Sequence, residues 1–71
     1  MEEQLLSVIG KRLKTRRKEL GITQAKLSYA CETDASYIRK VEAGKVNISI
    51  GNLAEIVKAL DWTLSELLND L

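Results

Sequence analysis

Apolar residues recur along the chain at helical spacing, in short blocks that are separated by turn signals. The first block predicts a helix over residues 3–20, and Gly21 follows where helices favour a left-handed residue just after their end. Gly10 lies inside this helix and is expected to cost about 1 kcal/mol relative to alanine. The apolar positions of the block are Leu5, Leu6, Val8, Ile9, Leu13 and Leu20.

Two short helices are predicted next, and each follows a residue type that caps helix N-termini well. One helix over residues 24–31 follows Thr23, and another over residues 35–43 follows Asp34 and ends at Gly44. The turn between them consists of Glu32 and Thr33. We expect their inner faces to hold Ala25, Leu27, Ala30, Cys31, Ile38 and Val41.

The last third of the chain predicts two more helices. Ser49 caps a helix over residues 50–60. Thr63 and Glu66 form a capping box at the start of a helix over residues 64–69. The apolar stripe of the longer helix consists of Ile50, Leu53, Ile56, Val57 and Leu60. The whole pattern therefore predicts an all-α chain of five helices.

The chain of 71 residues is long enough for one domain, which we assign to residues 1–71. Domains of this size are marginally stable, and many gain stability from disulfides, metals or oligomerisation. A single cysteine cannot form an internal disulfide, and a chain without histidine lacks a standard zinc site. Oligomerisation is therefore the remaining source of added stability. We interpret Cys31 as a core residue rather than a redox or metal-binding residue.

Several functional classes are excluded by what the sequence lacks. It has no histidine, no glycine-rich phosphate loop and no paired carboxylates at a plausible spacing, so we expect no enzyme, no cofactor and no small-molecule ligand. No apolar run reaches the roughly 18 residues of a membrane span. An acidic start and a free cysteine favour a cytoplasmic protein.

Charge is unevenly distributed, although the net charge is only +1. Residues 11–45 hold ten Lys or Arg and four Asp or Glu, whereas residues 46–71 hold one Lys and four acidic residues. An anionic partner would meet the basic part, with the acidic tail facing away. The basic run over residues 11–18 has two possible roles, which are to keep the protein soluble and to attract DNA at long range.

Residues 23–44 have the layout of a helix-turn-helix motif, in which two short helices are joined by a tight turn. The second helix of such a motif enters the major groove of DNA and presents its N-terminal residues to base edges. The helices would be locked together by Leu27, Ala30, Ile38 and Val41. Small residues at their crossing would be Ala30 and Ala35. The outward face carries hydrogen-bond donors at Ser36, Arg39 and Lys40.

The same segment resembles the XRE family, the helix-turn-helix proteins of the Cro and phage-repressor type. The resemblance is gapless over residues 23–44, and it rests on Gly21–Gln24, Leu27, Tyr37–Ile38 and Val41–Gly44. It implies a five-helix, lambda-repressor-like domain and a sequence-specific transcription regulator that binds double-stranded DNA. Residues 34–38 and 47–49 are also similar to the controller proteins of restriction–modification systems, which are short stand-alone dimers.

The resemblance also implies roles for individual residues. Base contacts would come from Ala35, Ser36, Arg39 and Lys40. Contacts with the DNA backbone would come from Thr23, Gln24, Tyr37, Lys45 and Asn47, and Gln24 would also brace the recognition helix. Arg17 would form a structural ion pair with Glu42 and tie the first helix to the third. Two positions depart from the family pattern: Glu32 stands where the turn usually has glycine, and Ala35 stands where a longer polar side chain is common.

The end of the chain offers a surface for self-association. It holds more apolar residues than so short a tail needs, namely Trp62, Leu64, Leu67, Leu68 and Leu71. We predict a symmetric homodimer through the last two helices. Its two reading helices would contact the half-sites of a palindromic operator about 34 Å apart.

Blander interpretations stay open for three of these residues. Gln24 could simply be a helix former, and Tyr37 could simply be a solvated helix residue. For Trp62, a place in the core or the dimer interface is favoured over a role as a platform for base stacking. At the level of function, the alternative is an antitoxin or protein-interaction module on the same fold. A regulator of this kind is expected at the nucleoid.

Overall fold

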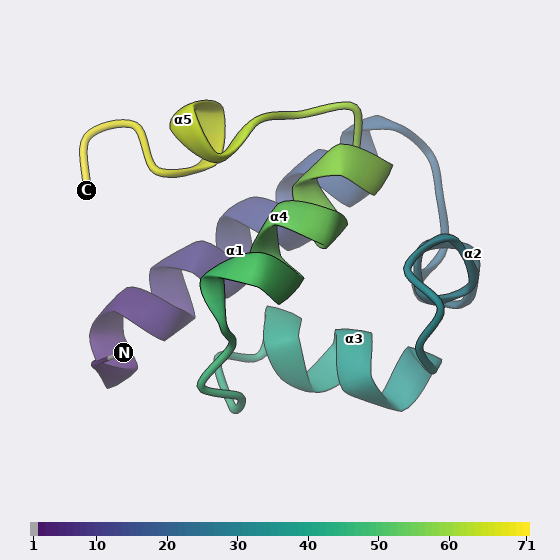
Figure 1. Cartoon of the computed structure of the whole chain (residues 1–71), viewed down its shortest axis with the longest axis horizontal. Coiled ribbons are helices and arrows are strands. Elements are labelled where there is room, and N and C mark those ends of the chain that lie inside the picture. The colour runs from purple at the N-terminus through teal and green to yellow at the C-terminus, as the bar shows by residue number, and fades with distance from the viewer. Residues whose placement is uncertain (1) are drawn as a thin grey trace.

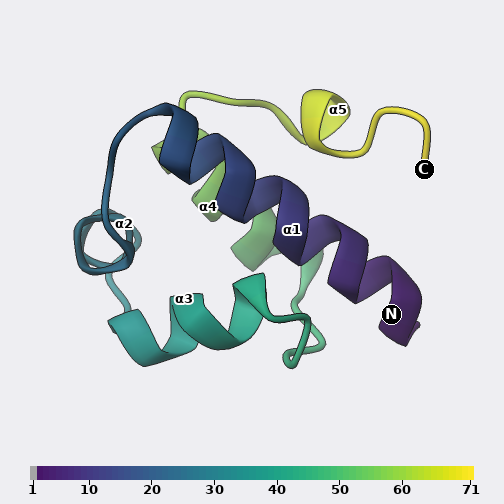
Figure 2. The same cartoon turned by 180° about the vertical axis from the view of Figure 1, so that it is seen from behind.

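The computed structural model describes residues 2–71 and contains five α-helices over that range, with no strand in it. Their bounds are α1 Glu3–Glu19, α2 Gln24–Ala30, α3 Ala35–Glu42, α4 Ile50–Ala59 and α5 Leu64–Leu67. The long helix α1 and helix α4 run through the middle of the molecule, with α3 along one side and α5 along the opposite side (Figures 1 and 2). The prediction of an all-α, five-helix chain is confirmed.

The predicted helix starts are confirmed by their capping hydrogen bonds. In each case the cap's side-chain oxygen accepts a hydrogen bond from the backbone N–H three residues later, with caps at Thr23, Asp34, Ser49 and Thr63. Thr63 and Glu66 form the complete capping box. The helix ends were predicted slightly late, most of all in α5, which stops at Leu67 instead of residue 69. The backbone turns left-handed soon afterwards, with φ 65° at Asp70.

The core is a continuous cluster of aliphatic side chains from every helix, together with Ile48 from the loop before α4. Its buried members are Leu6, Ile9, Leu13, Leu27, Ile38, Val41, Ile48, Leu53, Ile56, Val57, Leu60 and Leu67. Three large apolar residues named from the helical pattern are exposed, namely Val8, Leu20 and Ile50. Leu20 is exposed because it lies at the C-cap, beyond the last turn of α1. Ile50 is 61% exposed because it stands at the first residue of α4, ahead of that helix's buried turns.

Gly10 has a different role from the weak point that the sequence predicted. A Cβ atom at this position would collide with the backbone carbonyl oxygen of Glu42 and would lie 2.7 Å from that of Val41. The missing side chain therefore lets α1 approach the C-terminal end of α3 closely. Nearby, Gly44 has φ 72° and packs against the backbone of Ser7. Within residues 2–71, no helix is long and apolar enough to cross a membrane.

Candidate nucleic-acid interface

The inner face of helix α2 matches the prediction at two of four positions. Leu27 is buried and Cys31 half-buried as predicted, whereas Ala25 and Ala30 are exposed and Ser28 is buried. The inward positions are 24, 27, 28 and 31, which is the spacing of one helical face. The prediction assigned only apolar residues to the inner face, whereas one of its buried residues is the polar Ser28. Ser28 Oγ donates a hydrogen bond to the carbonyl oxygen of Ala25 at 2.7 Å, which satisfies the hydroxyl group inside the protein.

The turn between α2 and α3 contains a left-handed residue at Glu32, the position where the family usually has glycine. Glu32 has φ 56°, a conformation that costs a non-glycine residue roughly 1 kcal/mol. Two backbone hydrogen bonds close the turn, from Glu32 N to the Tyr29 carbonyl at 3.2 Å and from Thr33 N to the Ser28 carbonyl at 2.9 Å. These bonds satisfy carbonyl groups at the end of α2, so the turn is fixed despite its strained residue.

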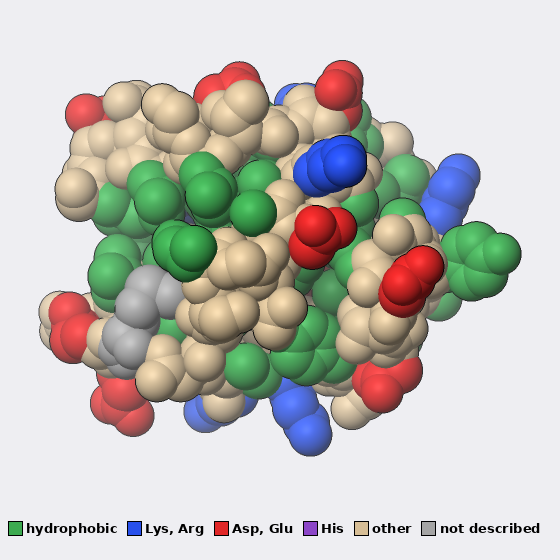
Figure 3. Space-filling model, in the orientation of Figure 1, with side chains coloured by type: hydrophobic (Ala, Val, Ile, Leu, Met, Phe, Trp, Pro, Cys, Tyr) green, Lys and Arg blue, Asp and Glu red, His purple; other side chains and the backbone are tan. Residues whose placement is uncertain are grey.

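Helix α3 separates an inner face from an outer one. Ile38, Val41 and Glu42 are buried. Three of the predicted base-contacting residues, Ser36, Arg39 and Lys40, are exposed, whereas Ala35 is half-buried. Tyr37 is also half-buried and packs against the core, so it is no freely solvated helix residue. Figure 3 shows Lys and Arg side chains at the lower edge of the molecule, where α3 lies.

A buried carboxylate joins α1, α2 and α3. Arg17 donates from Nε to Glu42 Oε2 at 2.7 Å and from Nη2 to Glu42 Oε1 at 3.1 Å. The structure thus contains the ion pair that the family resemblance implies. Arg17 Nη1 also donates to the carbonyl oxygen of Ile22 at 2.9 Å. A paired, bidentate geometry with further hydrogen bonds is what a buried charge needs to offset its desolvation.

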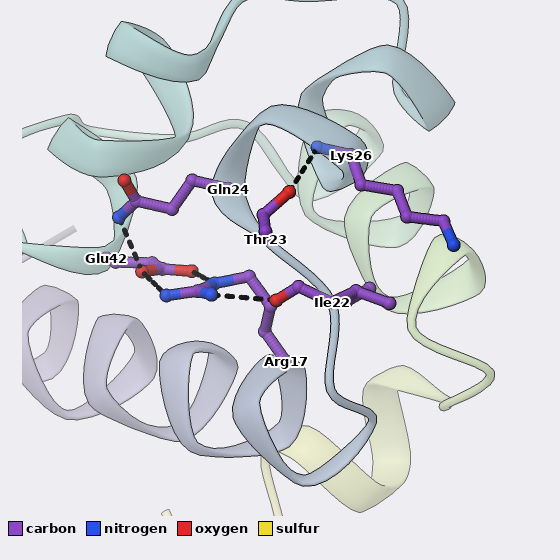
Figure 4. Close-up of polar contacts among 6 residues, drawn as sticks. All are labelled: Arg17, Ile22, Thr23, Gln24, Lys26 and Glu42. Carbon is purple, nitrogen blue, oxygen red and sulfur yellow. Dashed lines mark hydrogen bonds and ion pairs between the residues drawn. The ribbon is translucent and has the colours of Figure 1, made fainter.

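Gln24 belongs to the same network and contacts α3, as the family resemblance implies, although the resemblance does not name Glu42 as its partner. Its Nε2 donates to Glu42 Oε1 at 3.0 Å, so the carboxylate accepts three side-chain hydrogen bonds. Figure 4 shows Gln24 and Arg17 converging on Glu42 from α2 and α1, while the Lys26 side chain extends away. An amide nitrogen carries two hydrogens. One N–H of Gln24 can therefore brace α3 while the other donates to a ligand such as a phosphate.

The remaining positions predicted to grip the DNA backbone lie at the ends of α2 and α3. Thr23 is the N-cap of α2, where its hydroxyl oxygen accepts the hydrogen bond of Lys26 N at 3.0 Å. Lys45 and Asn47 are exposed in the loop after α3. The loop leaves the helix through the left-handed Gly44, and Lys45 N donates to the Lys40 carbonyl at 2.9 Å.

The basic run of α1 is only partly available to an anionic partner. Arg17 is buried with Glu42, and Arg12 and Arg16 donate to backbone carbonyls near the C-terminus. The exposed members are Lys11, Lys14 and Lys18. Direct contact with an anionic partner is therefore open to three lysines, whereas Arg12 and Arg16 keep their charge but use their N–H groups on backbone carbonyls.

Cys31 lies at the other side of the motif, half-buried between α2 and α4. Its Sγ is 4.0 Å from the carbonyl oxygen of Glu55. Burial raises the pKa of the Cys31 thiol, and the nearby Glu55 carboxylate raises it further. A thiol with a raised pKa is a poor nucleophile at neutral pH, in keeping with a packing role.

The structure changes the predicted self-association surface at two positions: Leu67 is excluded from it and Ile50 is added to it. Leu67 is 0% exposed and belongs to the core of its own chain, so we remove it from that surface. Trp62, Leu64 and Leu68 are half-buried. Ile50 and Leu71 are the large apolar residues most exposed on α4 and after α5. Figure 3 shows hydrophobic side chains gathered between α5 and the N-terminal end of α4.

Comparison with known families covers most of the fold. A model of a helix-turn-helix family matches residues 13–67, which include both helices of the motif and the core helix α4. The chain belongs to this family. It is therefore an XRE-type helix-turn-helix protein and a DNA-binding regulator, in a family of regulators rather than enzymes.

Individual relatives of this helix-turn-helix protein match over most of their own length. Control protein C.MunI from a Mycoplasma species is 38% identical over 63 residues, which span 87% of this chain and 85% of the relative. The crystal structure of the restriction–modification controller protein C.AhdI from Aeromonas hydrophila is similar, with TM-score 0.83, 35% identity and 87% and 90% coverage of the two chains. The clp gene regulator ClgR from Corynebacterium glutamicum matches with TM-score 0.87, 25% identity and 89% and 81% coverage.

Proposed function

We propose that this protein is a sequence-specific transcription regulator of the restriction–modification controller type, which binds a palindromic operator as a homodimer. The observation that carries the proposal is the exposed polar face of α3, braced from beneath by the buried network of Arg17, Gln24 and Glu42. A reading helix must be held at a fixed angle to place its side chains within hydrogen-bond distance of base edges. The network supplies that rigidity from two other helices.

Base readout is assigned to α3. Arg39 and Lys40 donate to guanine O6 and N7, and Ser36 can pair with either donors or acceptors. Ala35 is too short to hydrogen-bond and contributes at most a methyl contact with thymine. The phosphate backbone is contacted by Thr23, Gln24, Tyr37, Lys45 and Asn47, of which Tyr37 would use only the exposed part of its ring. Such contacts set orientation and affinity rather than sequence preference.

The controller assignment is supported by length as well as identity. The two restriction–modification relatives are matched over 85% and 90% of their own chains, so little of either protein lies outside the shared region. ClgR, a regulator of clp genes, has the same fold at lower identity. Similarity to short controller proteins therefore favours that role, and such a protein acts at the DNA of the nucleoid.

The homodimer is proposed from the apolar surface of α4 and the tail. Its members on one chain are Ile50, Trp62, Leu64, Leu68 and Leu71. A small domain that exposes such residues gains stability by covering them with a second copy. Two copies related by a two-fold axis present two α3 helices to successive major grooves, which raises affinity through both half-sites.

Binding measurements on single variants separate residues that recognise the DNA sequence from residues that bind any DNA. The probes are a labelled duplex selected by the protein from a random pool and a scrambled duplex of the same composition. Arg39→Ala is expected to lower the preference for the selected duplex by about tenfold, because a bidentate guanine contact is lost. Lys45→Ala should weaken both duplexes alike and reduce the salt slope by about one.

Lys58→Ala provides the matched control. It removes the same charge from the C-terminal end of α4, on the far side of the molecule from α3 (Figures 1 and 2). Affinity for both duplexes should change little. An unchanged preference in Arg39→Ala would show that the reading residue is assigned wrongly. A wild-type protein that does not discriminate between the duplexes would contradict the function and favour a protein-interaction module.

A further inference from the structure

Two arginines of α1 bind the C-terminal part of the chain. Arg12 Nη1 donates to the carbonyl oxygens of Leu67 at 2.8 Å and Asn69 at 2.6 Å. Arg16 donates from Nε to the Leu60 carbonyl at 3.1 Å and from Nη2 to the Asp61 carbonyl at 3.0 Å. The two arginines are four residues apart, so they lie one above the other on the same face of α1.

The carbonyl groups that they bind belong to the ends of two helices. Helix α4 has its C-cap at Leu60 and α5 has its C-cap at Leu68. The last carbonyls of a helix lack backbone partners and carry partial negative charge, which a guanidinium group both satisfies and neutralises. The Arg16 guanidinium also lies 5.7 Å from the centre of the Trp62 ring, within the range of a cation–π interaction.

The segment is held to the core by apolar contacts, through the fully buried Leu67 and the half-buried Trp62, Leu64 and Leu68. Helix α5 has only four residues, which is too short for a helix that is stable by its own hydrogen bonds. Apolar contacts are not directional, so directed hydrogen bonds add a restraint on orientation that packing alone does not give. The four arginine hydrogen bonds attach residues 60–69 at both ends, so they determine how the segment lies on α1.

We propose that Arg12 and Arg16 are positioning residues for the homodimer, and that they act by fixing the α5 segment rather than by attracting DNA. This inference rests on the proposed dimer, because the segment carries Trp62, Leu64 and Leu68. A tilt of the segment would displace these side chains relative to Ile50 on α4 and open the apolar surface that a second copy covers. The direction of the segment therefore sets the affinity of the dimer.

The test compares Arg12→Ala and Arg16→Ala with Lys14→Ala, which removes an equal charge from an exposed position of α1. Sedimentation equilibrium gives the dimer dissociation constant of each full-length variant. Each arginine variant is expected to raise it by about tenfold, the factor typical of hydrogen bonds with a charged partner. Lys14→Ala should stay within about twofold of the wild type, because exposed charges contribute little.

A charge-preserving variant distinguishes positioning from simple electrostatics. Arg12→Lys keeps the charge but cannot reproduce two directed hydrogen bonds from one planar group. We expect its dissociation constant to rise nearly as much as that of Arg12→Ala. Hydrogen exchange should show faster exchange at residues 60–69 in both variants, with unchanged protection in α3. This pattern would show local release of the segment in a protein that is otherwise folded.

The possible outcomes separate this inference from the proposed function. A dimeric wild type with Arg12→Ala equal to Lys14→Ala would overturn the positioning role and leave the dimer intact. Full recovery in Arg12→Lys would also overturn it, because charge alone would then suffice. A wild type that stays monomeric at high concentration would overturn the proposed dimer and this inference together.

Discussion

Glu42 shows how far a single residue could be predicted from the sequence. Its pairing with Arg17 follows from the family resemblance, because both residues stand at matching positions of the motif. The resemblance also implies that Gln24 braces the recognition helix, but not that Glu42 accepts its hydrogen bond, because a spacing of 18 residues says nothing about how two flexible side chains meet. In the structure the Gln24 amide meets the Glu42 carboxylate inside the protein, where that carboxylate has almost no contact with solvent.

Replacing Glu42 tests this buried network. Glu42→Gln keeps the side-chain shape but leaves the Arg17 guanidinium buried without its counter-charge. We expect the free energy of unfolding, measured with urea, to fall by about 3 kcal/mol or more. Glu19→Gln is the matched control, since Glu19 forms an exposed pair with Arg16 at 4.0 Å and should change stability by less than about 0.5 kcal/mol. Equal effects of the two variants would contradict a structural role for the network.

The helices themselves were the most predictable level of the structure. Their starts follow from capping residues such as Asp34 and Thr63, whose side chains act on backbone groups only three residues away. The packing face of α2 was predicted correctly for Leu27 and wrongly for Ala25 and Ala30, because the buried small residue is the polar Ser28. The role of Gly10 was also missed, since the reason for a glycine there lies in α3 and is not visible in the local sequence.

Gly10→Ala tests the close packing of α1 against α3, and Gly51→Ala in the open surface of α4 is its control, with an effect of opposite sign. Gly10→Ala is expected to lower the free energy of unfolding by about 2 kcal/mol, because the added methyl group meets backbone atoms that cannot move aside. Gly51→Ala in α4 should raise it by about 0.5 kcal/mol, because no heavy atom lies within 4 Å of the added Cβ and alanine favours helix. Thermal unfolding followed by circular dichroism measures both. Stabilisation by Gly10→Ala would contradict the close approach of the helices.

At the scale of the whole molecule, the sequence predicted the fold better than it predicted which apolar residues are exposed on the proposed dimer surface. Periodicity and the family motif indicate five helices and the reading face of α3. They do not show that Arg12 and Arg16 bind the tail, because those contacts join residues 44 to 57 positions apart. For the same reason the sequence assigned Leu67 to the dimer surface and Ile50 to the core, which is the reverse of their exposure.

Selection of binding sites from a random DNA pool tests the central claim most directly. A dimer that reads DNA with two copies of α3 should enrich a palindromic consensus whose half-sites are centred about 10 base pairs apart. Guanines are expected within each half-site, because Arg39 and Lys40 are the exposed donors of the reading helix. Enrichment of a single unpaired half-site would contradict the dimer, and a pool that remains unenriched would contradict sequence-specific binding.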